Sequence, residues 1–168
     1  MSTVGEEILG LVVYAAELQD YALRSVILTD RQALQVPLSA LSHLAAQGKF
    51  SSETAALIGA VSPSFFSEIG GFLGGRVWSN LKNKVRDEPV VKINRFPLPA
   101  DVLNAAVMRL SYDKIKEIRI KKPMMSTDRV LYFGAGLLRS TGVLFDGRAV
   151  EDVKNLIKNT PLATKLKD

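Results

Sequence analysis

The chain has 168 residues, of which 47% are hydrophobic and 23% charged, and it contains no cysteine. This composition predicts one globular domain, residues 1–168, with an ample core. It excludes disulfides, thiolate metal ligands and a cysteine nucleophile. The net charge is +5, and it divides unevenly into −3 for residues 1–80 and +8 for residues 81–168. This polarity predicts a basic face that meets an anionic partner.

Targeting and membrane signals are also missing from the sequence. The first residues carry two acids, Glu6 and Glu7, where a signal peptide needs basic residues. No run of about 20 uninterrupted apolar residues is present, so we expect the protein not to be integral to a membrane. With the lack of cysteine, these features predict a cytoplasmic location.

The first half of the chain has the spacing of helices. Thr3 and Glu6 form a capping-box pattern that predicts a helix to about Leu28. Its apolar stripe is wide, which indicates a mostly buried helix. Pro37 is predicted to begin a second helix that ends at Gly48, and Ser51 or Ser52 caps a third that runs to Val61.

Ser62 and Pro63 are predicted to begin a fourth helix that runs to about Arg86. Each glycine inside a helix costs about 1 kcal/mol relative to alanine. We therefore expect the four glycines of this helix to form a close-packing face: Gly70, Gly71, Gly74 and Gly75.

The second half mixes strand and helix patterns. Val90–Ile93 predicts a short strand, Ala100–Leu110 a helix, and Ile115–Lys121 a strand with Ile118 and Ile120 inward. Residues 128–145 fit either a strand or a helix, and we favour a helix in which Gly134 and Gly136 allow close packing. Residues 148–158 form a last helix or strand. The resulting fold class is α+β, with a mainly helical part, 1–88, and an α+β part, 89–160, that holds a small antiparallel sheet.

The sequence contains no recognisable set of catalytic residues. His43 is the only histidine, and neither a thiol nor a second imidazole is present to complete a transition-metal site. We therefore expect a structural role for His43, no metal, no cofactor and no enzyme activity.

A basic cluster is the strongest candidate for a binding site. With Tyr112, Tyr132 and Phe133 nearby, it has the phosphate contacts and the stacking platforms that nucleic-acid surfaces use. Its members are Lys114, Lys116, Arg119, Lys121, Lys122 and Arg129.

Two segments resemble a known family. Residues 69–81 and residues 134–145, the latter followed by Val150–Val153, resemble the glycine-containing helices of transport protein particle (TRAPP) core subunits and vinyl-reductase-type domains. The resemblance implies helices on a small antiparallel sheet, pairing of domains through helices, and a scaffold or hydrophobic-ligand role without catalysis. The lipid-modified cysteine of some TRAPP subunits has no counterpart here.

Two functions remain open at this point. The first is a non-enzymatic ligand-binding or scaffold domain of this kind, which assembles as a homo- or hetero-oligomer, most simply a dimer, and presents its basic face to an anionic partner or membrane surface. The alternative is a nucleic-acid-binding subunit of a nucleoprotein complex. A core helix at 128–145 would favour the first function, and a strand that exposes Tyr132 and Phe133 would favour the second.

Overall fold

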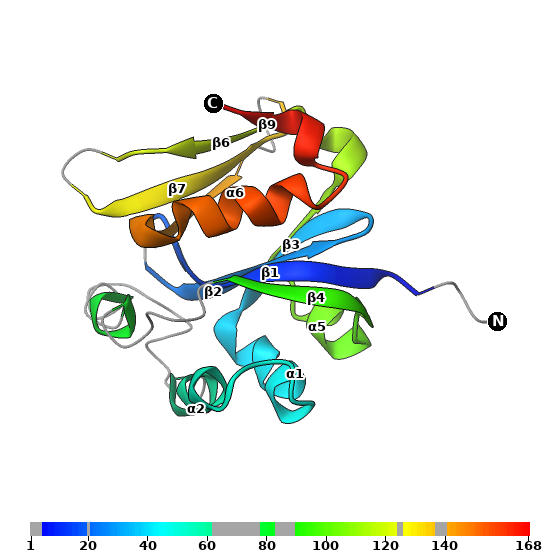
Figure 1. The fold of residues 1–168 in the computed structure, drawn as a ribbon, viewed down its shortest axis with the longest axis vertical. Helices are drawn as coiled ribbons and strands as arrows, with labels where there is room; N and C mark the ends of the chain where they lie inside the picture. Colours follow the sequence, from blue (N-terminus) through cyan, green and yellow to red (C-terminus); the bar gives the residue numbers. More distant parts are fainter. Residues whose placement is uncertain (1–4, 20, 62–77, 83–89, 124–125, 137–140) are drawn as a thin grey trace.

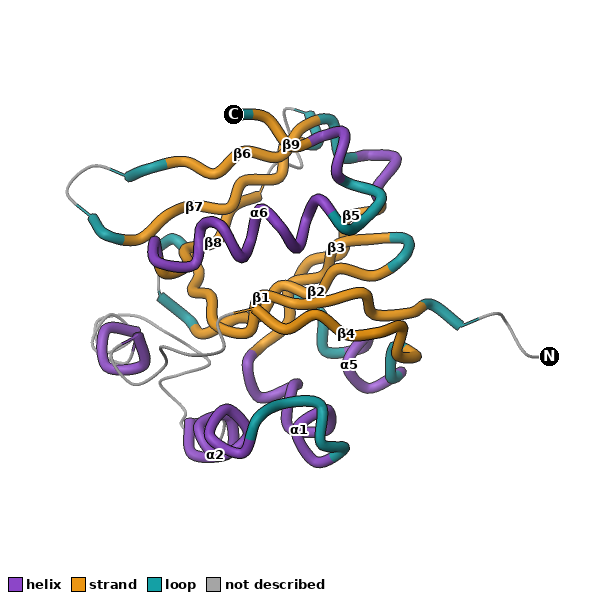
Figure 2. The backbone as a smooth tube through the Cα atoms, in the orientation of Figure 1, coloured by secondary structure: helices purple, strands orange, loops and turns teal. Residues whose placement is uncertain are grey.

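In the computed structural model, residues 5–19, 21–61, 78–82, 90–123, 126–136 and 141–168 are described (Figure 1). Within these residues a nine-stranded mixed sheet extends through both halves of the chain, with β4 off the main path on β1. The main path of the sheet has the strand order β5-β3-β2-β1-β8-β7-β6-β9. Among the described strands only β6 and β9 pair in parallel, and Figure 2 shows these two strands near the C-terminus.

The elements before the gap at 62–77 are three strands followed by short helices. They are β1 (Glu7–Glu17), β2 (Leu23–Thr29), β3 (Gln32–Pro37), the 3-10 helix η1 (Leu38–Leu41), α1 (Ser42–Ala46) and α2 (Ser52–Val61). A helical segment covers residues 78–82. The later elements are β4 (Val90–Pro97), α5 (Ala100–Asn104), β5 (Met108–Ser111), η2 (Tyr112–Lys114), β6 (Glu117–Lys121), β7 (Asp128–Gly134), β8 (Thr141–Asp146), η3 (Gly147–Ala149), α6 (Val150–Lys158), η4 (Ala163–Lys165) and β9 (Leu166–Lys167).

The sheet branches at β1. One edge of β1 pairs with β2, whereas the other edge pairs with β4 near its beginning and with β8 at Ala16 and Glu17. Register shifts in β1 accompany this change of partner. On either side of β1 the main path forms one wing of the sheet: β2, β3 and β5 form the first wing, and β8, β7, β6 and β9 form the second.

Hydrophobic residues are buried on both faces of the central strands. Leu11 and Val13 of β1 belong to a core that also contains residues of η1, α1, α2 and the 78–82 segment. Val12 and Ala15 belong to a second core, which is covered by α6. In Figure 1, α6 lies on one side of β1 and β2, and α1 and α2 lie on the other.

The predicted helix from Thr3 to Leu28 is wrong, since these residues form β1 and β2. Nearly every residue from Ile8 to Ala16 is buried, because helices cover both faces of this part of the sheet. Such a strand has a continuous apolar run, and a wide helical stripe can be drawn through any such run. The Glu6 carboxylate of the predicted capping box instead accepts hydrogen bonds from Thr29 and Gln32.

The next two predicted helices are confirmed. Residues 38–46 form η1 and α1, and Gly48 follows with a φ of +73°, the left-handed conformation that favours glycine after a helix. α2 covers the third predicted helix, and the Ser51 hydroxyl accepts a hydrogen bond from the Thr54 N–H at 3.2 Å.

The predicted helix at 128–145 is wrong for its described residues, 128–136 and 141–145. They contribute β7 and β8, which pair antiparallel, and the period of two is visible in burial: Leu131 and Phe133 face α6, as do Val143 and Phe145. The helical spacing of Val130, Gly134 and Thr141 is a coincidence of sequence, since these residues lie in β7 and β8. The predicted helix at 100–110 ends early, because α5 stops at Asn104 and β5 begins at Met108.

The predicted strand at 115–121 is confirmed as β6, and the strand at 90–93 is confirmed within β4. Residues 148–158 are mainly the helix α6. The fold class is nevertheless wrong, because strands rather than helices dominate the beginning of the chain and the sheet is large and mixed. Most of the predicted helix at 62–86 lies outside the described residues. Among the residues that are described, no helix is long and apolar enough to cross a membrane.

Candidate functional site

Part of the basic cluster lies on the face of β6 that points away from α6. Alternation along the strand buries Ile118 in the core under α6 and turns Arg119 and Lys121 to the opposite side, where both are exposed. Glu117 lies on the same side as these two cations. The predicted inward and outward positions of β6 are therefore confirmed for Ile118, Arg119 and Lys121.

The neighbouring strands extend this face. Arg119 is opposite Tyr132 of β7 and beside Lys167 of β9, and Tyr132 is opposite Gly142 of β8. Adjacent strands lie about 4.8 Å apart, so these four residues form one row across the sheet. Lys165 holds the C-terminal end in position, because its Nζ donates to the Tyr112 carbonyl at 2.8 Å.

Tyr132 lies at the centre of this row and is partly exposed. The Nζ of Lys121 is 3.9 Å from the centroid of its ring, which is a cation–π contact. Gly134 leaves room for the ring, since a Cβ there would lie 3.3 Å from Tyr132 Cε1. Leu18 borders the row beside Gly142 and is 41% exposed. We call Arg119, Lys121, Tyr132 and Lys167 the cationic face.

One acid reduces the charge of the cationic face. The Nε of Arg119 donates to Glu117 Oε2 at 3.1 Å, and both side chains are partly exposed. A pair of this exposure contributes little to stability. Glu117 therefore acts chiefly on the local potential, which it makes less positive.

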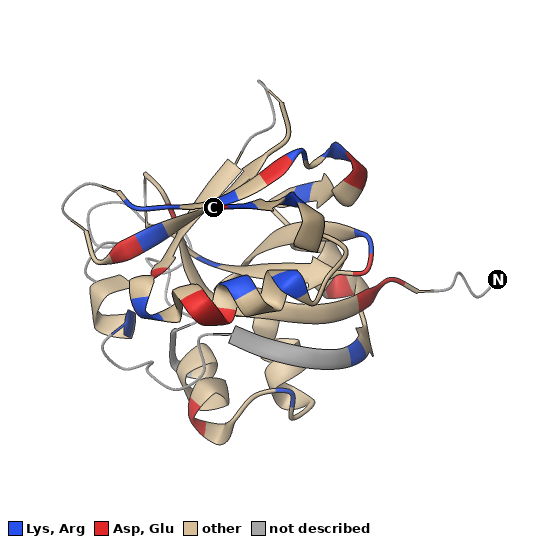
Figure 3. Ribbon diagram, turned by 45° about the horizontal axis from the view of Figure 1, so that its top comes forward, with Lys and Arg blue, Asp and Glu red and all other residues tan. Residues whose placement is uncertain are grey.

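The other predicted basic residues lie elsewhere. Lys114 is exposed in η2, directly after β5. Lys116 is exposed directly before β6, where its N–H donates to the Gly134 carbonyl of β7, and Lys122 is exposed after the end of β6. Arg129 is half-buried and donates to the main-chain carbonyls of Thr127 and Asp128. Figure 3 shows basic residues on several elements, α6 among them, and not in one patch.

Of the three aromatic residues near the cluster, only Tyr132 is partly exposed. Phe133 is buried under α6. Tyr112 is buried and its hydroxyl donates to the Thr29 carbonyl. Burial raises the pKa of Tyr112 well above its ordinary value, and the negative charges of Asp30 and Glu6 raise it further.

The remaining candidates do not join this face. His43 is exposed, with Nε2 2.9 Å from the Gln47 amide nitrogen and Nδ1 3.8 Å from Asp101. Gly134 is in β7, and Gly136 follows it with a φ of +93°, so neither lies in a helix. The other four glycines with a predicted packing role lie outside the described residues: Gly70, Gly71, Gly74 and Gly75. Within the described part, no three histidine or acidic side chains lie together as metal ligands would.

A buried polar cluster holds the 78–82 segment against the start of β7. Asp128 accepts a hydrogen bond from Trp78 Nε1 at 3.0 Å and pairs with Lys82 Nζ at 2.7 Å. Arg148 donates to the Lys82 carbonyl and binds Asp146, which lies opposite Asp128 across β7 and β8. Asp128 and Trp78 are almost fully buried, so the cluster is structural.

Sequence reasoning missed one residue of the cationic face, Lys167, and two of its neighbours, Glu117 and Gly142. Lys167 belongs to a strand of two residues, too short for any periodicity to indicate. Glu117 was recognisable in principle, since it shares the period of two with Arg119 and Lys121. Comparison with known proteins adds nothing, because no protein-family model, curated protein or solved structure matches the chain.

Proposed function

We propose that this protein is a non-catalytic binding domain whose cationic face binds single-stranded nucleic acid. One observation carries the proposal: β7 is a strand, and it presents a partly exposed Tyr132 on the sheet face away from α6, opposite Arg119 and in contact with Lys121. An aromatic ring among cations provides a stacking platform for a base beside contacts for the phosphates.

The geometry favours a single strand over a duplex. The cationic face is built from neighbouring strands of a sheet, and unpaired bases can lie flat against side chains of such a surface. A duplex hides its bases, so the Tyr132 ring would have no base to stack on. The exposed side chain of Leu18 adds apolar area at the border, where a second base could lie.

The test is the affinity of a fluorescent single-stranded oligonucleotide at low salt. Three cations predict a log–log salt slope of about −2, so binding should weaken about twentyfold between about 50 and 200 mM salt. Arg119→Glu/Lys121→Glu should abolish binding. Tyr132→Ala should cost about 1–3 kcal/mol, the usual value of one stacked base.

Two further variants sharpen this experiment. Lys154→Glu/Lys158→Glu makes the same change of charge on α6, which covers the other face of the sheet, and should bind almost as the unmodified protein does. Glu117→Gln removes the acid of the face and should strengthen binding. Equal affinity for the two double variants would overturn the proposal. Binding to anionic vesicles but not to the oligonucleotide would also overturn it, in favour of a membrane surface.

The dimeric scaffold implied by the TRAPP resemblance remains a prediction. One segment that carries the resemblance, residues 69–81, is mostly outside the described residues, and the other, 134–145, contains the end of β7 and the strand β8 where the resemblance implies a helix. A cytoplasmic location, where single-stranded RNA is abundant, belongs to the proposal.

A further inference from the structure

The strand β5 ends one wing of the sheet. Its only neighbour among the described strands is β3. An edge strand presents a row of main-chain N–H and C=O groups to which another extended chain can pair. We propose that the β5 edge binds an extended acidic segment of a partner protein as an added strand. This site is separate from the cationic face and goes beyond the proposed function.

The ladder shows which groups of β5 point outward. The Tyr112 N–H donates to the Arg31 carbonyl at 3.1 Å, and Leu110 and Met108 are opposite Ala33 and Gln35. Hydrogen-bonded and non-hydrogen-bonded pairs alternate in an antiparallel ladder. The N–H and C=O groups of Arg109 and Ser111 therefore point away from β3, toward an incoming strand.

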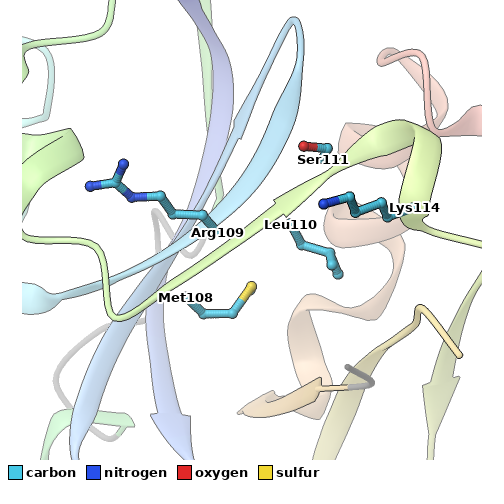
Figure 4. A pocket seen from close by; sticks show the side chains of 5 residues that line it. All are labelled: Met108, Arg109, Leu110, Ser111 and Lys114. Atoms are coloured by element: carbon cyan, nitrogen blue, oxygen red, sulfur yellow. The ribbon is translucent and has the colours of Figure 1, made fainter. Parts of the chain in front are cut away.

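A cavity accompanies this edge. Its volume is about 350 Å³, and it is lined by Met108, Arg109, Leu110, Ser111 and Lys114 (Figure 4). Figure 4 shows Met108 and Leu110 on one side of β5 and Arg109 on the other. Val107, just before the strand, is 54% exposed, the most exposed large hydrophobic residue in the described part of the chain. The edge thus offers main-chain groups, an apolar surface and a pocket for a side chain.

Charge decides the occupant. Arg109 and Lys114 line the cavity at the edge and are exposed, and the acid Asp113, directly before Lys114, is exposed as well. If two copies of this chain paired through β5, the antiparallel arrangement would bring these cations together, and like charges opposite one another destabilise a sheet. A segment with acidic side chains meets the same surface with complementary charge. Arg109 already donates to the Leu103 carbonyl at 2.9 Å, which holds its guanidinium in position.

The experiment uses a short fluorescent peptide that alternates valine with glutamate, and a second peptide with lysine in place of glutamate. The full chain should bind the first peptide and not the second. Ser111→Pro is the sharpest variant, because Ser111 has a φ of −60° that proline adopts without strain, and its N–H is not needed by β3. It should weaken binding about fivefold, as expected for one main-chain hydrogen bond.

Charge variants separate this site from the cationic face. Arg109→Glu/Lys114→Glu should weaken peptide binding at least about tenfold at low salt, while Arg119→Glu/Lys121→Glu should leave it unchanged. The inference is overturned if the acidic peptide does not bind, if Ser111→Pro binds it as tightly as the unmodified protein, or if the lysine peptide binds equally well. A dimer in sedimentation that Ser111→Pro dissociates would assign the edge to a second copy instead.

Discussion

Replacement of Asp128 by alanine tests the account of how the 78–82 segment is held. Asp128 is 5% exposed, and its two carboxylate oxygens serve different partners, Trp78 Nε1 and Lys82 Nζ. The substitution leaves the indole N–H buried without an acceptor and the ammonium group without its counter-charge. Because this one buried carboxylate binds two side chains of the segment, we expect a large loss of stability.

The magnitude follows from burial. Removing one partner of a buried ion pair costs about 3–5 kcal/mol. The Lys82 side chain is 19% exposed and can reach water in part, which places the expected loss at the lower end, about 3–4 kcal/mol. For a chain of this length, this corresponds to a melting temperature lower by about 6–16 °C. Asp128→Asn keeps an acceptor for Trp78 and should cost about 1.5–3 kcal/mol, the value of a charged hydrogen bond.

The assay is urea unfolding followed by tryptophan fluorescence. Trp78 is the only tryptophan of the chain, so the emission reports directly on the segment that Asp128 holds. Asp113→Ala removes an exposed acid and is the matched control. A double-mutant cycle with Lys82→Met should give a clear coupling energy. The reasoning is refuted if Asp128→Ala unfolds within about 0.5 kcal/mol of the control, or if the cycle is additive.

Two other predictions concern the β7–β8 end of the sheet. A Cβ at Gly147 would lie 2.0 Å from the Thr127 carbonyl oxygen, so Gly147→Ala should destabilise the protein by about 1–3 kcal/mol. The control is Gly59→Ala in α2, where a Cβ meets open space, and it should stabilise the protein by about 0.5–1 kcal/mol. Effects of the same sign for the two variants in urea unfolding would contradict this prediction. Burial raises the pKa of Asp146, but the hydrogen bonds and charge of Arg148, with the charge of Lys82, lower it more, to below its ordinary 3.8. Asp146 therefore stabilises the fold above about pH 4 and loses this effect as the pH falls through its folded-state pKa, so Asp146→Asn should be less stable at pH 7 and lose less stability between pH 4 and 2.

The sequence predicted elements best where one face of an element meets water. β6 was recognised because Arg119 and Lys121 alternate with Ile118, and α2 because Ser51 caps it. β1 was taken for a helix because both of its faces are covered, and no polar residue marks its period between Ile8 and Ala16. Tertiary packing, rather than local preference, decides such a segment.

The candidate sites were predictable in part for the same reason. The residues of β6 and β7 on the cationic face were found from their charge and aromaticity. Their neighbour Lys167 comes from the far end of the chain, and only the parallel pairing of β9 brings it there. The β5 edge was missed entirely, because residues 100–110 fit a single helix and nothing local indicates that the chain turns after Asn104.

The row that joins Lys167, Arg119 and Tyr132 is difficult to explain by stability alone. Arg119 and Lys167 are direct neighbours across two strands, and like charges in this position oppose pairing. Glu117 offsets the charge of Arg119, but the ion pair is too exposed to contribute much. Lys121 is held by the Tyr132 ring, which leaves its positive charge in place. A bound phosphate backbone would supply anions beyond the single carboxylate of Glu117, and this is the physical reason to seek a ligand on this face.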